Sequence, residues 1–261
     1  MKGLLEEIHR RHYILSAAGW GFVLLALAFA VGIVVDDREL LGINLWIKPL
    51  KFALSLAIFL WTMGWVIHDA KLKHHPRYIF GWLFIFFMLV EIVIIGLQSY
   101  RGEISHFNNS SRLDGMLYTF MGFAIGFNTL TLGVLAVIFF VKKFALPGPY
   151  LWAIRLGLIV LVLGSLEGVL IVRNYAHTVG AVDGGPGLPF LNWSTTHGDL
   201  RVAHFFGIHA LQVFMVVGGW LGTTRLKEGR ATALMILFAI LYSAMVFAMF
   251  NQAMDEQPFL G

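Results

Sequence analysis

Seven apolar runs, each near the ~20 residues that a helix needs to cross the hydrocarbon core of a bilayer, constrain this chain more than any other feature. Of its 261 residues, 58% are hydrophobic and only 13% are charged, a balance that is untypical of water-soluble globular domains. The sequence therefore predicts an all-α polytopic integral membrane protein, a seven-transmembrane-helix bundle. The runs cover residues 13–35, 49–67, 79–97, 115–141, 150–172, 201–221 and 231–252.

The Lys and Arg residues give this bundle an expected orientation. Eleven of the 19 fall in the amino-terminal segment or in the loops after the second, fourth and sixth runs, and seven fall on the opposite side. Because cytoplasmic loops carry the excess of basic residues, we expect a cytoplasmic amino terminus and an extracytoplasmic carboxyl terminus. The expected location is the inner (plasma) membrane of a bacterium. Since the basic residues are dispersed between apolar runs, we expect the lipid bilayer and no nucleic acid as partner.

The outer connections are longer than the inner ones and carry the unusual residues. We expect residues 1–261 to form one domain, with an extracytoplasmic cap formed mainly by residues 98–114 and 173–200. The Gly and Pro density of the second segment predicts a tight, turn-rich cap rather than a strand or helix. Its Phe190, Leu191 and Trp193 argue against disorder.

Four polar side chains lie inside the apolar runs: Glu91, Glu167, His209 and Gln212. An acid near the middle of a spanning helix costs roughly 2.5–3.5 kcal/mol, and such residues usually face a bundle interior, a partner or an aqueous pathway. At a rise of 1.5 Å per residue, all four lie in the predicted outer half of the bundle. We expect them to meet in one polar cavity open to the outside, with Glu91 and Glu167 as the catalytic residues and one of them as general base.

A metal at this cavity would take nitrogen or oxygen ligands, because the chain has no cysteine. Glu103 and His106 would share one face if their segment is helical. His204 and His209 are five residues apart on the sixth run and align only if Gly207 permits a π-bulge. We predict that these four residues, the pair Glu103 and His106 and the pair His204 and His209, bind zinc or iron. A hydrogen-bonded network of the same residues without metal is the main alternative, and copper on methionine sulfur is less favoured.

The runs that contain the two acids share a faint pattern. Glu91 is followed by Arg101 on the outer side, and Glu167 is followed in the same way by Arg173. A parallel repeat of this kind would place a ligand pocket where its halves meet. The residues predicted to bind the cofactor or ligand are Gln98, Arg101, Gln212 and Arg173.

Three pairs of glycines are spaced as GxxxG: Gly122/Gly126, Gly164/Gly168 and Gly218/Gly222. This spacing lets helices approach closely. We expect tight packing within the bundle, and the same faces offer a contact for an oligomer.

Three functions fit these residues. The favoured one is a metal-assisted membrane enzyme, an oxidoreductase or hydrolase, acting on a small or lipophilic substrate. The others are a proton- or cation-coupled transporter or channel, and a ligand-sensing or assembly subunit. A simple path across the membrane is disfavoured because the run inward of Gln212 is apolar, with Asn128 the only candidate to extend it. Retinal is excluded as cofactor because no lysine lies deep in the last run.

Overall fold

The computed structural model describes residues 3–260 as an all-helical protein with four very short strands. In this range, six helices are long and apolar enough to cross a membrane, and up to seven spans result if one bent pair of helices forms a single span. The predicted helical membrane bundle is confirmed at this level. The coordinates divide into two compact units, one within residues 3–131 and one within residues 132–260.

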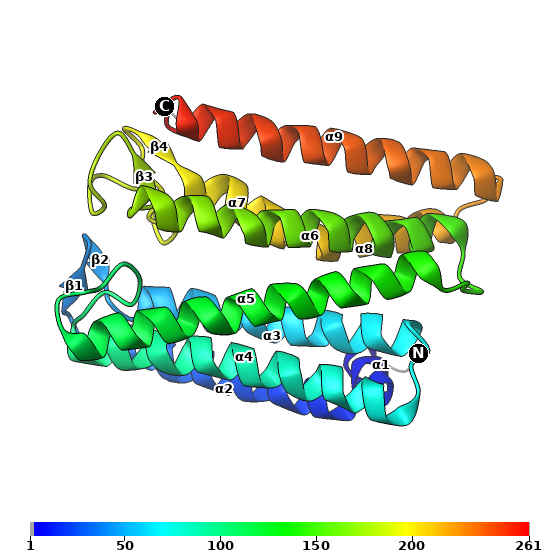
Figure 1. Cartoon of the computed structure of the whole chain (residues 1–261), viewed down its shortest axis with the longest axis horizontal. Coiled ribbons are helices and arrows are strands. Elements are labelled where there is room, and N and C mark those ends of the chain that lie inside the picture. Colours follow the sequence, from blue (N-terminus) through cyan, green and yellow to red (C-terminus); the bar gives the residue numbers. More distant parts are fainter. Residues whose placement is uncertain (1–2, 261) are drawn as a thin grey trace. The chain divides into compact units, whose positions relative to one another are not determined.

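The first unit holds the first four helices and most of the fifth (Figure 1). These are α1 (Leu4–Arg11), α2 (Tyr13–Val35), α3 (Ile47–Asp69), α4 (His74–Arg101) and α5 (Arg112–Val141), with the strands β1 (Glu39–Leu40) and β2 (Ile43–Asn44) between α2 and α3. The helix α2 packs closely on α3, which in turn packs on α4. Ile95 of α4 and Met121 of α5 belong to the buried apolar core of this unit.

Two indole groups fix α2 against α3. Gly19 leaves space for the ring of Trp61, whose Nε1 donates to the Ser16 carbonyl at 3.2 Å. The ring of Trp46 stacks on Phe29 with a centroid distance of 5.8 Å. Each indole thus satisfies its N–H while filling a gap between helices, as buried tryptophans usually do.

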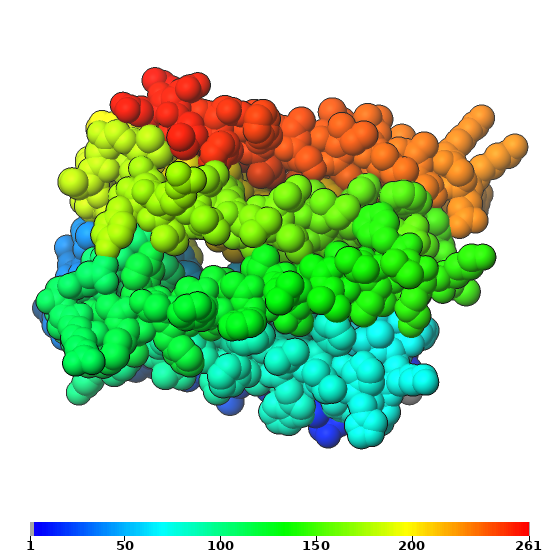
Figure 2. Space-filling model, viewed as in Figure 1, coloured from blue at the N-terminus to red at the C-terminus, as the bar shows by residue number. Residues whose placement is uncertain are grey.

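The second unit holds the last residues of α5, the helices α6 (Gly148–Asn174), α7 (Leu200–Ile208), α8 (Ala210–Gly222) and α9 (Glu228–Met254), and the strands β3 (Thr178–Val179) and β4 (Gly198–Asp199). The helix α6 packs against α7, α8 and α9. Phe214 and Met235 lie in its apolar core. Figure 2 shows α9, orange to red, at the surface of this unit along its length.

Glycines set the distance between α6 and the α7–α8 pair. A Cβ atom at Gly164 would lie 2.6 Å from the carbonyl carbon of Gly207, and one at Gly218 would lie 2.8 Å from the Pro149 oxygen. These backbones are therefore in direct contact, as the GxxxG spacing predicts. At Gly122 and Gly126, by contrast, an added Cβ meets no atom of the first unit within 4 Å.

The sixth apolar run is broken where the sequence analysis places one continuous helix. The helix α7 ends at Ile208, α8 begins at Ala210, and the two are bent by 42°. The break falls on His209, which has φ −97° and ψ 0°. Tyr242 of α9 donates from Oη to the Phe206 carbonyl at 2.9 Å and so satisfies a carbonyl of the last turn before the bend.

The loop between α6 and α7 is turn-rich, as predicted, but it also contains β structure. The strands β3 and β4 pair antiparallel at its base, with Thr178 opposite Asp199. The prediction that this segment contains no strand is therefore wrong in this detail. Two residues on each side are enough to close the loop, and such short pairs leave no sequence periodicity to detect.

Candidate functional site

Glu91 lies on α4 with 5% of its surface exposed, and its Oε1 has no hydrogen-bond partner among residues 3–260. Lys48, at the start of α3, attracts the Glu91 carboxylate electrostatically. Native proteins satisfy nearly all buried polar atoms, so an unpartnered carboxyl oxygen requires an explanation. Exchange of a proton or binding of a ligand is such an explanation.

His106 connects this buried acid to the loop between α4 and α5. Its Nδ1 is 3.3 Å from Lys48 Nζ and 3.0 Å from Ser105 Oγ. The rings of Phe52 and Tyr118 pack around the imidazole, at centroid distances of 6.2 and 6.3 Å. His106, Lys48 and Glu91 therefore form a line of polar groups that runs from the loop into the helices.

Asn128 of α5 is a further buried polar residue of this unit. The ring of Phe127 stacks on Phe87 at 6.3 Å, so the neighbouring Asn128 lies about one helical turn, roughly 5 Å, inward of Glu91. Asn128 is 4% exposed and its Oδ1 lacks a hydrogen-bond partner within the range that the structure describes.

Gln98 and Arg101 meet at a third residue, Asp114. Asp114 Oδ1 accepts from Gln98 Nε2 at 2.9 Å and from Arg101 Nη1 at 2.5 Å, and Oδ2 accepts from the hydroxyls of Ser110 and Ser111. This network ties the end of α4 to the start of α5. The structure thus brings together two residues that we predict to bind a ligand, and it adds an aspartate that occupies their polar atoms.

The expected helical spacing of Glu103 and His106 does not form. The helix α4 ends at Arg101, and Gly102 turns the chain with φ 76°, a left-handed conformation that glycine adopts at helix ends. Glu103 Oε2 accepts instead from Asn108 Nδ2 at 3.3 Å. Because Glu103 lies in a loop, helical spacing does not determine the position of its carboxylate.

In the second unit, the imidazole of His204 is held by glycines of α6. The ring lies close enough to the Gly164 backbone to be influenced by it, and its Nδ1 is buried without a hydrogen-bond partner in the described part of the chain. A Cβ at Gly168 would lie 3.4 Å from His204 Cε1. The imidazole is therefore packed against glycines of α6, with Nδ1 left available.

Glu167 lies at the depth of this imidazole because it is the neighbour of Gly168 on α6. It is half-buried, and its Oε1 has no hydrogen-bond partner within residues 3–260. An acid and an imidazole, each with an unpartnered buried atom, thus come from adjacent helices at one level.

His209 and Gln212 lie deeper along the same bent segment. The His209 ring packs on Phe205 with a centroid distance of 4.6 Å, and it is close enough to His204 for an electrostatic effect. Gln212 is half-buried, and its Oε1 has no partner in the described range. A Cβ at Gly157 would lie 2.9 Å from the Cα of Leu211, which places the neighbouring Gln212 about three turns inward of Glu167.

The loop above His204 contains a second histidine. His177 Nδ1 is 2.6 Å from Asp183 Oδ2, and His177 is close enough to His204 for an electrostatic effect. Partial burial alone would raise the pKa of the Asp183 carboxyl, but hydrogen bonds from the His177 ring and from the backbone N–H groups of His177 and Thr178 hold that pKa well below its usual range.

Arg173, at the exposed end of α6, forms no ion pair with another residue in the described range.

Within either unit, residues 3–260 bring no three histidine, aspartate or glutamate side chains into an arrangement that could hold a metal ion. The donors nearest to such a set are His204, His209 and Glu167. Because the residues as placed do not form a ligand set, we derive no step that passes through a metal.

Three residues that matter here are missing from the predicted site. Lys48 is counted only as a loop charge, although a lysine directly before Pro49 at the start of an apolar run is a detectable signal. Tyr242 is the one tyrosine of its apolar run. The role of the Gly164 carbonyl has no sequence signal beyond the GxxxG spacing.

No protein-family model, curated protein or solved structure matches this chain. Its function is therefore argued from the geometry of these side chains.

Proposed function

We propose that this protein is a membrane enzyme that transfers protons to or from a small or lipophilic substrate on the extracytoplasmic side. The loops that carry His106 and His177 would face outward, the amino terminus would lie in the cytoplasm and the carboxyl terminus outside. The polar groups of each unit begin at these loops and end at an amide, Asn128 or Gln212, whose oxygen is unpartnered in the described chain. A polar site that opens at one side of the membrane and ends within the bundle suits catalysis better than transport across the membrane.

The observation that carries this proposal is the arrangement of His204 and Glu167. We infer that the other ring nitrogen of His204 donates to the Gly164 carbonyl, which would fix the tautomer of this histidine. The buried Nδ1, which has no partner in the described range, would then be the acceptor. A protonated Glu167 would act as the acid and the imidazole as the base. In the first unit, Lys48 would stabilise the charged form of Glu91.

Turnover of a membrane lipid extract tests this function. The parent protein and the variants Glu167→Gln and His204→Gln are reconstituted with the extract, and the extract is compared by mass spectrometry over time. We expect the parent to change at least one component and each variant to slow that change by about 100-fold or more, the usual size of an acid–base contribution. Glu256→Gln alters an exposed acid near the end of the chain and serves as control. Variants that turn over the extract as fast as the parent would refute the assignment.

Metal assistance by zinc or iron stays part of the proposal as a separate prediction. Histidine ligands commonly donate their other ring N–H to a carbonyl, the role that we infer for Gly164 at His204. Elemental analysis of the purified parent and of His204→Ala and His209→Ala tests it. Stoichiometric metal that both variants lose supports a metal-assisted enzyme, and a metal-free, active parent excludes it.

A proton- or cation-coupled transporter is the second candidate, because the break at His209 resembles the interrupted helices that form transporter sites near the membrane midplane. Liposomes that contain a pH-sensitive dye separate the two functions. If a pH gradient collapses faster with the parent than with Glu91→Gln or Glu167→Gln, transport is supported. Equal rates for parent and variants exclude proton movement through these acids.

A further inference from the structure

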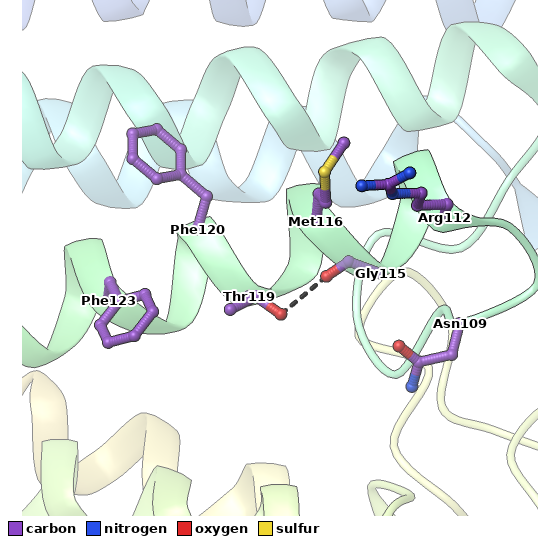
Figure 3. A pocket seen from close by; sticks show the side chains of 7 residues that line it. All are labelled: Asn109, Arg112, Gly115, Met116, Thr119, Phe120 and Phe123. Carbon is purple, nitrogen blue, oxygen red and sulfur yellow. Dashed lines mark hydrogen bonds between the residues drawn. The ribbon is translucent and has the colours of Figure 1, made fainter.

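The helix α5 carries a hollow of about 460 Å³ within the first unit. Its lining runs from a polar end to an apolar end along one stretch of the helix (Figure 3). The lining residues are Asn109, Arg112, Gly115, Met116, Thr119, Phe120 and Phe123. Neither acid of the proposed catalytic sites is among them.

The polar end of the hollow is cationic. Arg112 forms no ion pair with any residue from 3 to 260. The nearest acid along α5, Asp114, already accepts hydrogen bonds from Gln98, Arg101 and Ser111. Its carboxylate is therefore committed elsewhere, and the guanidinium of Arg112 is available for an external anion.

The rest of the hollow is apolar. Met116, Phe120 and Phe123 are 54%, 51% and 62% exposed, and the hydroxyl of Thr119 is satisfied by the Gly115 carbonyl of its own helix at 2.7 Å. Gly115 and Thr119 are smaller than the lining residues beside them. The surface is therefore recessed at these two positions, where an acyl chain can lie. Among the lining residues between Arg112 and Phe123, the one polar side chain, Thr119, is thus already satisfied.

The length of the hollow matches one leaflet. Arg112 and Phe123 are eleven residues apart, which corresponds to about 16 Å along the helix. Half of a hydrocarbon core that is about 30 Å thick is about 15 Å. A cation at the head-group level and an apolar recess of one leaflet's depth together fit an amphiphile with an anionic head group.

We propose that this hollow binds an anionic phospholipid of the adjacent leaflet, with the phosphate on Arg112 and one acyl chain against Met116, Phe120 and Phe123. Arginine suits this role because its planar guanidinium donates two parallel hydrogen bonds to a phosphate. The site is independent of the proposed catalytic residues. Binding of the lipid can therefore be measured without any assay of activity.

Native mass spectrometry of the full-length protein, with phosphatidylglycerol or phosphatidylcholine as the added lipid, tests the proposal. We expect the parent to retain one phosphatidylglycerol in preference to phosphatidylcholine. The variant Arg112→Gln should lower that retention about fivefold, the contribution expected of one basic residue near an anionic lipid surface. Arg225→Gln, an exposed arginine between α8 and α9 that has no ion pair in the described chain, should leave the retention unchanged.

A second pair of variants separates the shape of the hollow from its charge. Thr119→Trp fills the recess at an exposed position and should abolish retention although Arg112 is intact. Leu130→Trp lies on the same helix, 64% exposed, but outside the hollow, and should behave like the parent. Equal retention of the two lipids by the parent would overturn the proposal, and so would equal effects of the two arginine variants or of the two tryptophan variants. A parent that carries no lipid and forms a dimer broken by Arg112→Gln would instead assign the face to a second copy.

Discussion

Tyr242 Oη donates a hydrogen bond of 2.9 Å to the carbonyl oxygen of Phe206. This bond joins α9 to the last turn of α7, directly before the 42° bend at His209. A carbonyl that faces the interior of a membrane protein without a donor costs several kcal/mol in hydrocarbon. The bond therefore helps to keep the helix broken at this point, and with it the placement of His209.

Tyr242→Phe should destabilise the second unit by about 1–3 kcal/mol, because it leaves the Phe206 carbonyl without its donor. Thermal unfolding in detergent measures the loss. Tyr100→Phe changes an exposed tyrosine at the end of α4 and is the control. An unchanged midpoint for Tyr242→Phe would show that packing alone maintains the bend.

Lys48→Met should affect Glu91 without affecting the second unit. The substitution removes the charge that attracts the Glu91 carboxylate and keeps most of the side-chain volume, so it favours the neutral acid. Hydrophobic carbodiimides modify protonated carboxyl groups in membranes, and we expect faster labelling of Glu91 and unchanged labelling of Glu167. Mass spectrometry of the peptides distinguishes the two acids. Equal labelling of Glu91 in the parent and in Lys48→Met would show that Lys48 does not influence Glu91.

The hydrogen bonds of Asp183 give the loop between α6 and α7 a defined dependence on pH. The folded-state pKa of Asp183 lies below its unfolded value of about 3.9. The stabilisation is therefore fully present above about pH 4 and is lost as the pH falls through the folded pKa. Hydrogen exchange of residues 175–199 should accelerate only in that acidic range.

Asp183→Asn should loosen the same loop at neutral pH. The amide cannot accept the three bonds from His177 and Thr178 as the carboxylate does, and bonds to a charged group are worth about 1.5–3 kcal/mol each. We expect rapid hydrogen exchange in residues 175–199 and no change in the core of α6. Exchange that is as slow as in the parent at neutral pH would remove Asp183 from the account of this loop.

The spans are predictable from the sequence because the bilayer imposes their length, and the run 13–35 coincides with α2 (Tyr13–Val35). The break at His209 is not, because it depends on a hydroxyl from α9 and on the close approach of Gly164 to Gly207. Side chains that interact across helices leave no local periodicity for a sequence pattern to report.

The candidate site is likewise predictable only in part from the sequence. Burial of Glu91 and the unpartnered oxygen of Glu167 agree with the cost of an acid in an apolar run. The helical spacing expected for Glu103 and His106 does not form because Gly102 ends α4 in a left-handed conformation, and a helix end is uncertain by a few residues in any sequence. Whether the two acids serve one site stays a prediction.

Gly164 provides the sharpest test of how His204 is held. A Cβ at this position would lie 2.6 Å from the Gly207 carbonyl carbon and 2.8 Å from its Cα, and neither backbone atom can move without shifting α7. Gly164→Ala should therefore cost about 1–3 kcal/mol, as overpacking does, and should release the His204 ring from the Gly164 backbone. Gly126→Ala, where the added Cβ meets nothing within 4 Å in the first unit, should be neutral or stabilise by up to about 1 kcal/mol. Thermal unfolding compares the two variants, and nitrogen NMR of labelled histidine reports whether the tautomer of His204 is still fixed. If Gly164→Ala unfolds like Gly126→Ala and keeps that tautomer, the close contact of α6 with α7 does not position the imidazole.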